Sequence, residues 1–189
     1  MPKKKNTSRS LADPSHLPAL DADDLTTIHV VIETPKGCRN KYAFDEERRL
    51  FVLKKVLPAG MAFPYDFGFV PSTRAEDGDP VDVLVLMDEP AFPGCLLTCR
   101  PVGLIEGEQG TKKKKIRNDR IVAIETENHS YTHITHVEDL GKPFIHELCL
   151  FFINYHELSD EQYRVLAVKG PRAARDRVRV RMKEGRRRT

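Results

Sequence analysis

The stretch DGDPVDVLVL at residues 77–86 joins an acidic turn to an apolar strand. The turn carries three carboxylates, on Asp77, Asp79 and Asp82. Carboxylates this close repel one another, so a site that keeps all three ionised needs a compensating positive charge. Gly78 permits and Pro80 fixes a bend that could bring them to one side. Hard divalent cations take oxygen ligands, and Mg²⁺ usually binds a few carboxylates together with substrate phosphates. The stretch therefore predicts a Mg²⁺ site that acts on a phosphate substrate.

Further short apolar runs flank this stretch and are separated by Pro- and Gly-containing turns. They cover residues 28–32, 41–44, 50–53, 81–87, 96–104 and 120–124. Side chains that alternate in this way are typical of strands, and many short strands between turn residues are typical of a barrel. The pattern predicts a mainly β or α+β domain built on a compact barrel of antiparallel strands.

Helical periodicity comes late in the chain. From Pro143, apolar residues recur at steps of three and four as far as Tyr155, which predicts a helix near 143–157 packed on the barrel. In the tail, Val178, Val180 and Met182 fit an edge strand, whereas Ala174, Val178 and Met182 fit a helical stripe. We prefer the helix, so the tail is expected to be partly helical.

Charge and composition divide the chain into three parts. Residues 1–10 carry +4 and residues 170–189 carry +7, which leaves 11–169 at −8 within a total of +3. We expect a flexible N-terminal arm at 1–24, a barrel domain at 25–170 and a basic tail at 171–189. The acidic body does not resemble a nucleic-acid-binding domain, so no specific nucleic-acid partner is expected.

The cysteines and the hydropathy indicate a cytoplasmic protein. The four cysteines form no C-x-x-C pair, and most fall within or beside apolar runs, so reduced structural thiols are expected. No apolar run reaches the length of about 18 residues that could span a bilayer, and no apolar segment follows the N-terminal lysines as in a signal peptide.

The acidic stretch and four other segments resemble the soluble, metal-dependent inorganic pyrophosphatases of the first family. The matching segments keep their order and spacing over roughly residues 25–157. They are HVVIETP at 29–35, NKY at 40–42, PYDFGF at 64–69 and RPVG at 100–103, together with the acidic stretch itself.

This resemblance implies an OB-like five-stranded barrel with flanking helices, and hydrolysis of pyrophosphate to two phosphates by a metal-activated water. It also implies a homo-oligomer, since bacterial relatives commonly form hexamers. By position, the metal ligands would be Asp77, Asp82 and Glu33. Asp79 would orient and deprotonate the water. The phosphates would be held by Lys41, Lys55 and Tyr155, with Lys55 standing where the family has arginine.

The match is uneven around the third metal-binding segment of that family. After the basic insertion at 111–115, Asn118 aligns with the family aspartate and Arg120 with its substrate-binding lysine. A shift of one residue makes Asp119 the metal ligand, which we prefer. Glu106 and Glu108 are weaker candidates for the remaining acidic position. Four other positions also depart from the family pattern: Ala43, Phe63, Phe67 and His156.

These departures leave more than one function open. The first hypothesis is an active inorganic pyrophosphatase with a modified phosphate-binding rim. The second is a degenerate paralogue that binds metal and phosphate ligands, or a partner, with little turnover. The third, an OB-type nucleic-acid binder, has only the basic tails in its favour.

Overall fold

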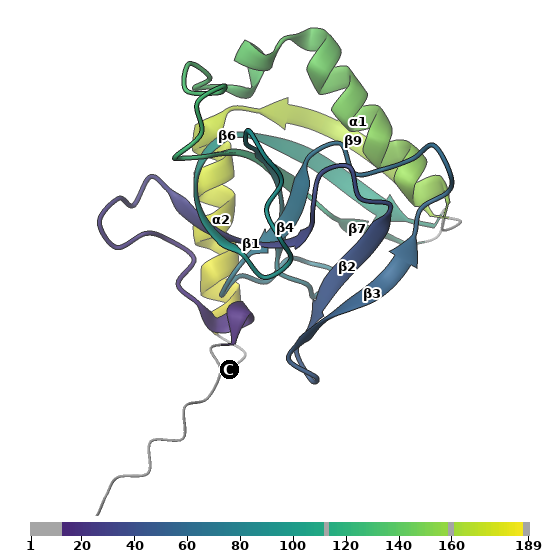
Figure 1. Ribbon diagram of the computed structural model, residues 1–189, viewed down its shortest axis with the longest axis horizontal. Helices are drawn as coiled ribbons and strands as arrows, with labels where there is room; N and C mark the ends of the chain where they lie inside the picture. The colour runs from purple at the N-terminus through teal and green to yellow at the C-terminus, as the bar shows by residue number, and fades with distance from the viewer. Residues whose placement is uncertain (1–12, 112–113, 159–160, 187–189) are drawn as a thin grey trace, which may run out of the picture.

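Five strands close into a barrel in the computed structural model, which describes residues 13–111, 114–158 and 161–186 (Figure 1). The strands are β1 (Ile28–Thr34), β4 (Asp66–Val70), β5 (Val81–Leu86), β8 (Arg120–Glu125) and β6 (Leu96–Gly110). They pair in that order, and β1 also pairs with β6, which closes the barrel. The predicted OB-like barrel with flanking helices is therefore confirmed.

The remaining elements surround this barrel. β2 (Asn40–Asp45) and β3 (Leu50–Val56) form a separate hairpin. β7 (Lys115–Arg117) and β9 (Gln162–Lys169) both extend the sheet along β6. The helices are α1 (Lys142–Glu157), α2 (Pro171–Arg186), and the short 3-10 turns η1 (Pro14–His16) and η2 (Val137–Leu140). Among the described residues, no helix is long and apolar enough to cross a membrane.

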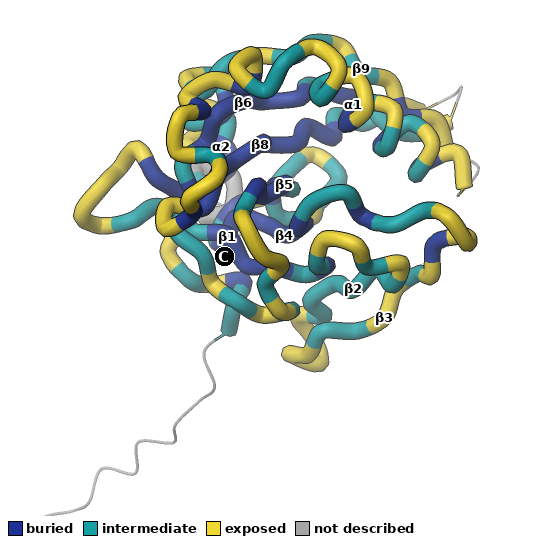
Figure 2. Tube along the Cα trace, turned by 45° about the horizontal axis from the view of Figure 1, so that its top comes forward, coloured by how far each residue is buried: buried dark blue, intermediate teal, exposed yellow. Residues whose placement is uncertain are grey.

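Alternation along β5 divides the core into two clusters. Val81, Val83 and Val85 pack in a cluster that includes Ala174 and Val178 of α2. Leu84 and Leu86 pack in a second cluster that includes Leu148 and Phe152 of α1. The barrel strands are accordingly buried along most of their length, while the β2–β3 hairpin is more exposed (Figure 2). Because side chains alternate with a period of two, Asp82 shares the face of β5 that carries Leu84 and Leu86.

One strand pair departs from the antiparallel barrel that the sequence predicted. β5 and β8 run parallel, with Asp82 opposite Arg120 and Leu86 opposite Ile124. A parallel pair needs a long crossover connection, and here the whole of β6 and β7 lies between the two strands in the sequence. The local periodicity of the sequence does not show which strands pair or whether they run parallel.

The described parts of the predicted arm and of the predicted tail contact the barrel. Residues 1–12 of the predicted arm and 187–189 of the tail lie outside the described residues. Residues 13–20, however, pack on the barrel: Ala19 is buried in the core, and Leu20 forms a bridge with Ile28. The tail forms α2, whose residues Ala174 and Val178 are fully buried.

Gly68 provides a test of the barrel packing. A Cβ added at Gly68 would lie 2.1 Å from the carbonyl oxygen of Val31, so Gly68→Ala must push β4 away from β1. We expect this change to lower the free energy of unfolding by about 3 kcal/mol, measured by urea denaturation. Gly170→Ala is the control, since its added Cβ would approach no atom closer than 3.6 Å. Equal urea midpoints for the two variants would contradict this account of the packing.

Candidate active site

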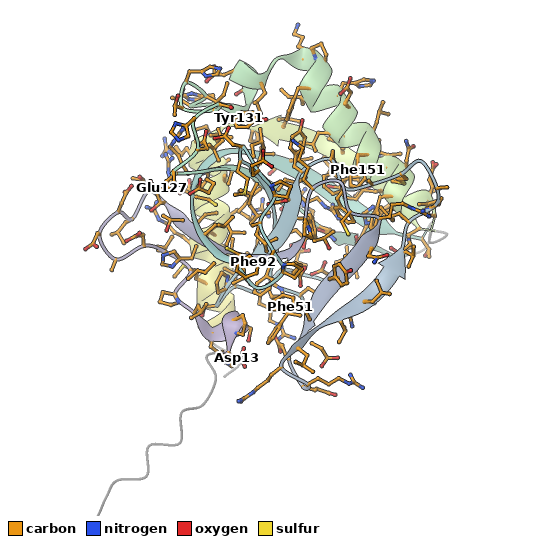
Figure 3. The ribbon with its side chains drawn as sticks, viewed as in Figure 1. Asp13, Phe51, Phe92, Glu127, Tyr131 and Phe151 are labelled. Carbon is orange, nitrogen blue, oxygen red and sulfur yellow. The ribbon has the colours of Figure 1, made fainter. Side chains whose placement is uncertain are left out.

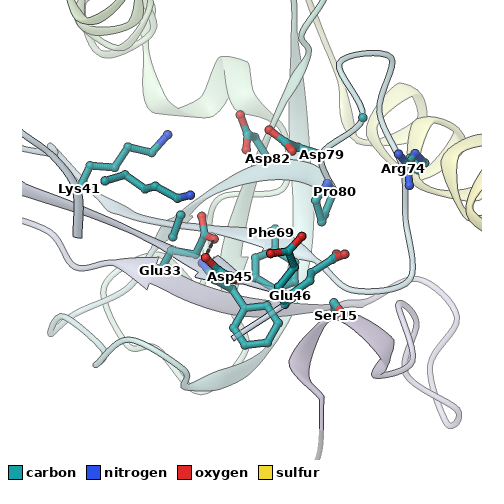
Figure 4. A pocket seen from close by; sticks show the side chains of 15 residues that line it. Ser15, Glu33, Lys41, Asp45, Glu46, Phe69, Arg74, Asp79, Pro80 and Asp82 are labelled. Atoms are coloured by element: carbon teal, nitrogen blue, oxygen red, sulfur yellow. Dashed lines mark hydrogen bonds between the residues drawn. The ribbon is translucent and has the colours of Figure 1, made fainter. Parts of the chain in front are cut away.

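A cavity of about 380 Å³ lies between the acidic turn and the β2–β3 hairpin. Asp79 and Asp82 stand side by side on one wall, and Glu33 and Lys41 point toward them from the facing wall (Figure 4). Four of the residues predicted from sequence thus line one cavity, although they come from β1, β2, the turn and β5. Asp77 does not line the cavity, but its charge interacts with those of Asp79 and Asp82.

Hydrogen bonds within the acidic turn explain its compact shape. The backbone N–H of Ala75 donates to Asp79 O at 2.7 Å, and that of Gly78 donates to Ala75 O at 3.2 Å. Asp77 Oδ1 accepts from the backbone N–H of Asp79 at 3.2 Å. Gly78 has φ +101°, a conformation that L side chains rarely adopt, so glycine is required there. The turn therefore forms one unit that leads directly into β5.

Arg120 lies behind Asp82, within the protein interior. Its Nη2 is 3.7 Å from Asp82 Oδ2, and only 3% of its side chain is exposed. The guanidinium carbon lies 4.2 Å from the ring centroid of Phe152 and 4.5 Å from that of Tyr163, both within cation–π range. Its Nε has no hydrogen-bond partner among the described residues. Arg120 is therefore placed to balance the charge of Asp82, although sequence alone suggested a phosphate ligand.

Uncharged side chains surround Arg120 on the side away from Asp82. Asn118 Nδ2 donates to Gln109 Oε1 at 2.7 Å. His156 Nε2 lies 2.9 Å from the same oxygen and 3.4 Å from Arg120 Nη2, while Nδ1 lies 2.8 Å from Phe152 O. Burial and the nearby Arg120 charge lower the pKa of His156 to about 4, so the ring is neutral near pH 7. Sequence reasoning missed Gln109 and Tyr163, because only the tertiary fold brings β6, β9 and α1 together here.

The structure does not bring Asp119 to the cavity. Adjacent side chains of a strand point to opposite faces, so Arg120 faces α1 while Asp119 faces α2. There Asp119 pairs with Arg177 and Arg117 and accepts a hydrogen bond from the backbone N–H of Gly107. The alternative acidic candidates are also engaged elsewhere: Glu106 pairs with Arg177 and Arg117, and Glu108 with Lys115 and Arg164.

Two lysines and a tyrosine lie together beside the cavity, although of the three only Lys41 lines it. Lys41 and Lys55 are register partners across the β2–β3 hairpin. Their Nζ atoms lie 5.5 and 4.8 Å from the ring centroid of Tyr155. Burial and the neighbouring Lys41 charge lower the pKa of Lys55. Two ammonium groups whose charges repel one another favour a nearby anion, such as a phosphate.

The carboxylates resist ionisation in the absence of a cation. Burial raises the pKa of Glu33 to about 7, and the charges of Asp82 and Asp79 add to this effect. Burial and the Asp82 charge raise the pKa of Asp77 to about 6, and burial also raises the pKa of Asp82. Glu33 Oε1 accepts a hydrogen bond from the backbone N–H of Phe44 at 2.8 Å, which fixes its direction. A bound divalent cation would relieve this repulsion.

The carboxylates suit a divalent cation by their chemistry, although they do not form a complete coordination shell. Among the described residues, no three His, Cys, Asp or Glu side chains stand close enough to enclose a metal ion. Mg²⁺ does not require a full protein cage, because it keeps several waters and shares substrate phosphates as ligands. The carboxylates that line the cavity and the lysines beside them provide for both partners.

An OB-like barrel whose carboxylate-lined cavity lies beside paired lysines defines the class of protein. A sequence profile described as inorganic pyrophosphatase matches residues 30–185. An inorganic pyrophosphatase of Synechocystis sp. is 38% identical over 157 residues, covering 83% of this chain and 89% of the relative. One from Methanosarcina acetivorans is 36% identical over 160 residues, covering 85% and 93%. The crystal structure of the Thermus thermophilus inorganic pyrophosphatase matches with a TM-score of 0.84 at 32% identity, covering 93% and 99%.

The chain therefore belongs to the inorganic pyrophosphatase family, as the resemblance of its motifs implied. Members of this family depend on metal ions. The comparisons do not favour the degenerate paralogue over the enzyme.

The raised carboxylate pKa values predict how the metal-free protein responds to pH. Because the pKa values of Glu33 and Asp77 are higher in the folded state, at about 7 and about 6, folding is favoured while both are protonated. This contribution is complete below their unfolded values and is lost as the pH rises through 6 to 7. With a chelator present, we expect the free energy of unfolding to fall by on the order of 2 kcal/mol between about pH 5 and about pH 8.

Glu33→Gln should remove much of this fall, whereas Glu127→Gln, in an exposed loop, should leave it unchanged. Urea denaturation over the same pH range measures both variants. A wild type whose urea midpoint does not change with pH would show that the carboxylates are not coupled as described.

Proposed function

We propose that this chain hydrolyses inorganic pyrophosphate to two phosphates with Mg²⁺ as its cofactor. One observation carries the proposal: Asp79 and Asp82 of the acidic stretch, Glu33 of β1 and Lys41 of β2 line a single cavity although they come from three separate segments of the chain. A site for a doubly charged cation and a polyanionic substrate needs both signs of charge within one pocket, as these residues provide. Membership of the inorganic pyrophosphatase family supports the same activity.

The proposed roles follow from position and charge. Asp77, Asp82 and Glu33 hold the metal, and Asp79 orients and deprotonates the attacking water. Lys41, Lys55 and Tyr155 hold the phosphates. Bound Mg²⁺ supplies a lowered pKa for that water and neutralises charge on the phosphoryl oxygens. Arg120 supports Asp82 from behind, since its burial leaves it little access to substrate. Asp119 is not among these metal ligands, because its ion pairs with Arg117 and Arg177 hold it on the side of β8 that faces α2.

We further propose that the protein is a cytoplasmic homo-oligomer, with a hexamer as the form to test. Large apolar side chains are exposed near the hairpin: Leu50 is 62%, Leu53 54% and Phe92 69% exposed. The loop that carries Phe92 approaches Phe51 of β3, since a Cβ on Gly94 would lie 3.2 Å from that ring (Figure 3). Apolar side chains grouped in this way favour contact between copies of the chain.

The activity is tested by phosphate release from pyrophosphate, with Mg²⁺ added or chelated. We expect release with Mg²⁺ and none with the chelator. Asp79→Asn should lower kcat by about 100-fold or more, because it removes the proposed proton acceptor. Asp23→Asn, in an exposed loop, is the control and should keep full activity. If the wild type turns over no faster than Asp79→Ala with every metal tried, the enzyme proposal fails.

A further inference from the structure

The acidic turn is held by a residue from the opposite end of the chain. Arg181, in α2, contacts the loop before Asp77 at two points. Its carbonyl oxygen accepts a hydrogen bond from the backbone N–H of Arg74 at 3.2 Å. Its Nη2 donates to Glu76 Oε1 at 2.7 Å. Figure 4 shows Arg74 beside α2, with the acidic turn next to it.

The burial of Arg181 is unusual for the charged face of a basic helix. The residue is 8% exposed, whereas the side chain of its neighbour Arg179 is 50% exposed and pairs with Asp176 of the same helix. Burying a guanidinium is costly unless it is paired and hydrogen-bonded. The ion pair with Glu76 offsets this cost. Arg181 therefore holds the loop and does not expose its charge to solvent.

Contacts at Arg74 and Glu76 reach the proposed metal ligands through the backbone. Ala75, between the two contact points, donates its N–H to Asp79 O and accepts from Gly78 N–H. The segment from 74 to 79 is thus closed by its own hydrogen bonds, and fixing one end of it fixes the other. The pair also occupies the carboxylate of Glu76, which adjoins Asp77 and would otherwise add to the repulsion within the turn.

We propose that Arg181 is a positioning residue that presets the acidic turn for metal binding. It touches neither substrate nor metal, and it acts through Glu76 and the backbone of Arg74. α2 thereby has a role in the site beyond its packing of Ala174 and Val178 in the core. This inference rests on the proposed function, since it concerns the affinity of the same site for its cation.

The test compares Arg181→Met with Arg179→Met in the full-length protein. Both changes remove one positive charge from α2, but only the first breaks the side-chain contact with Glu76, while the backbone hydrogen bond from Arg74 is kept. Mn²⁺ binding, measured by calorimetry, should weaken by about 10-fold in Arg181→Met and stay unchanged in Arg179→Met. Simple electrostatics predicts the opposite sign, because loss of a positive charge near a cation site strengthens cation binding.

Pyrophosphate hydrolysis gives a second readout. The Mg²⁺ concentration for half-maximal activity should rise by about the same 10-fold factor in Arg181→Met, while kcat at saturating Mg²⁺ stays near that of the wild type. A purely structural lesion would lower kcat at every metal concentration. Arg181→Lys, which keeps the charge and the stem, should restore part of the affinity.

Glu76→Gln tests the same contact from the partly exposed side, where folding is not at risk. The double variant Glu76→Gln/Arg181→Met has the net charge of the wild type but lacks the ion pair. We expect it to bind Mn²⁺ no more tightly than Arg181→Met alone, because both changes break one contact. Wild-type affinity in the double variant would overturn the inference, because electrostatics alone predicts that result when the two charge changes cancel.

The two proposals fail in different ways. If the wild type binds Mn²⁺ and hydrolyses pyrophosphate while Arg181→Met and Glu76→Gln bind Mn²⁺ as tightly, the positioning role of Arg181 is wrong and the enzyme proposal stands. If the wild type binds no divalent cation, the proposed function fails and the inference falls with it.

Discussion

The parallel pairing of β5 with β8 is the constraint on which the rest of the site depends. It sets Asp82 opposite Arg120 at the start of both strands. Both side chains then lie on the face of the barrel that α1 covers. Charge interactions strengthen where the local dielectric is low, so the pair depends on the aromatic rings that enclose the guanidinium. Phe152 and Tyr163 therefore contribute to the site although neither lines the cavity.

Carboxylates gather on both sides of the cavity and are not locally balanced by positive charge. Burial raises the pKa of Glu33 and of Asp77, which means that these carboxylates destabilise the metal-free fold near pH 7. A sequence optimised for stability alone would not place carboxylates there. Such a local conflict is expected where function requires it, and the surrounding barrel compensates through its fully buried Val and Ile side chains.

Much of the site could be predicted from sequence, since the acidic turn and its strand are local features. The side of β8 on which Asp119 lies could not be predicted. Period two assigns Asp119 and Arg120 to opposite faces, but only the pairing of β8 with β5 decides which one meets Asp82. β4 was missed because Asp66 and Gly68 interrupt its apolar run, although Gly68 is there to admit the backbone of Val31. The docking of residues 13–20 could not be predicted either, because it depends on contacts with β1.

Phe67, one of the positions that depart from the family pattern, affects what Lys41 can bind. Lys41 Nζ lies 5.6 Å from the ring centroid of Phe67 and 5.5 Å from that of Tyr155. An ammonium has three N–H donors, and a phenyl ring attracts the charge without accepting a hydrogen bond as a hydroxyl would. The ring of Tyr155 attracts the ammonium in the same way. With phenylalanine at position 67, the donors of Lys41 stay available to a phosphate, so this departure from the family pattern is compatible with substrate binding.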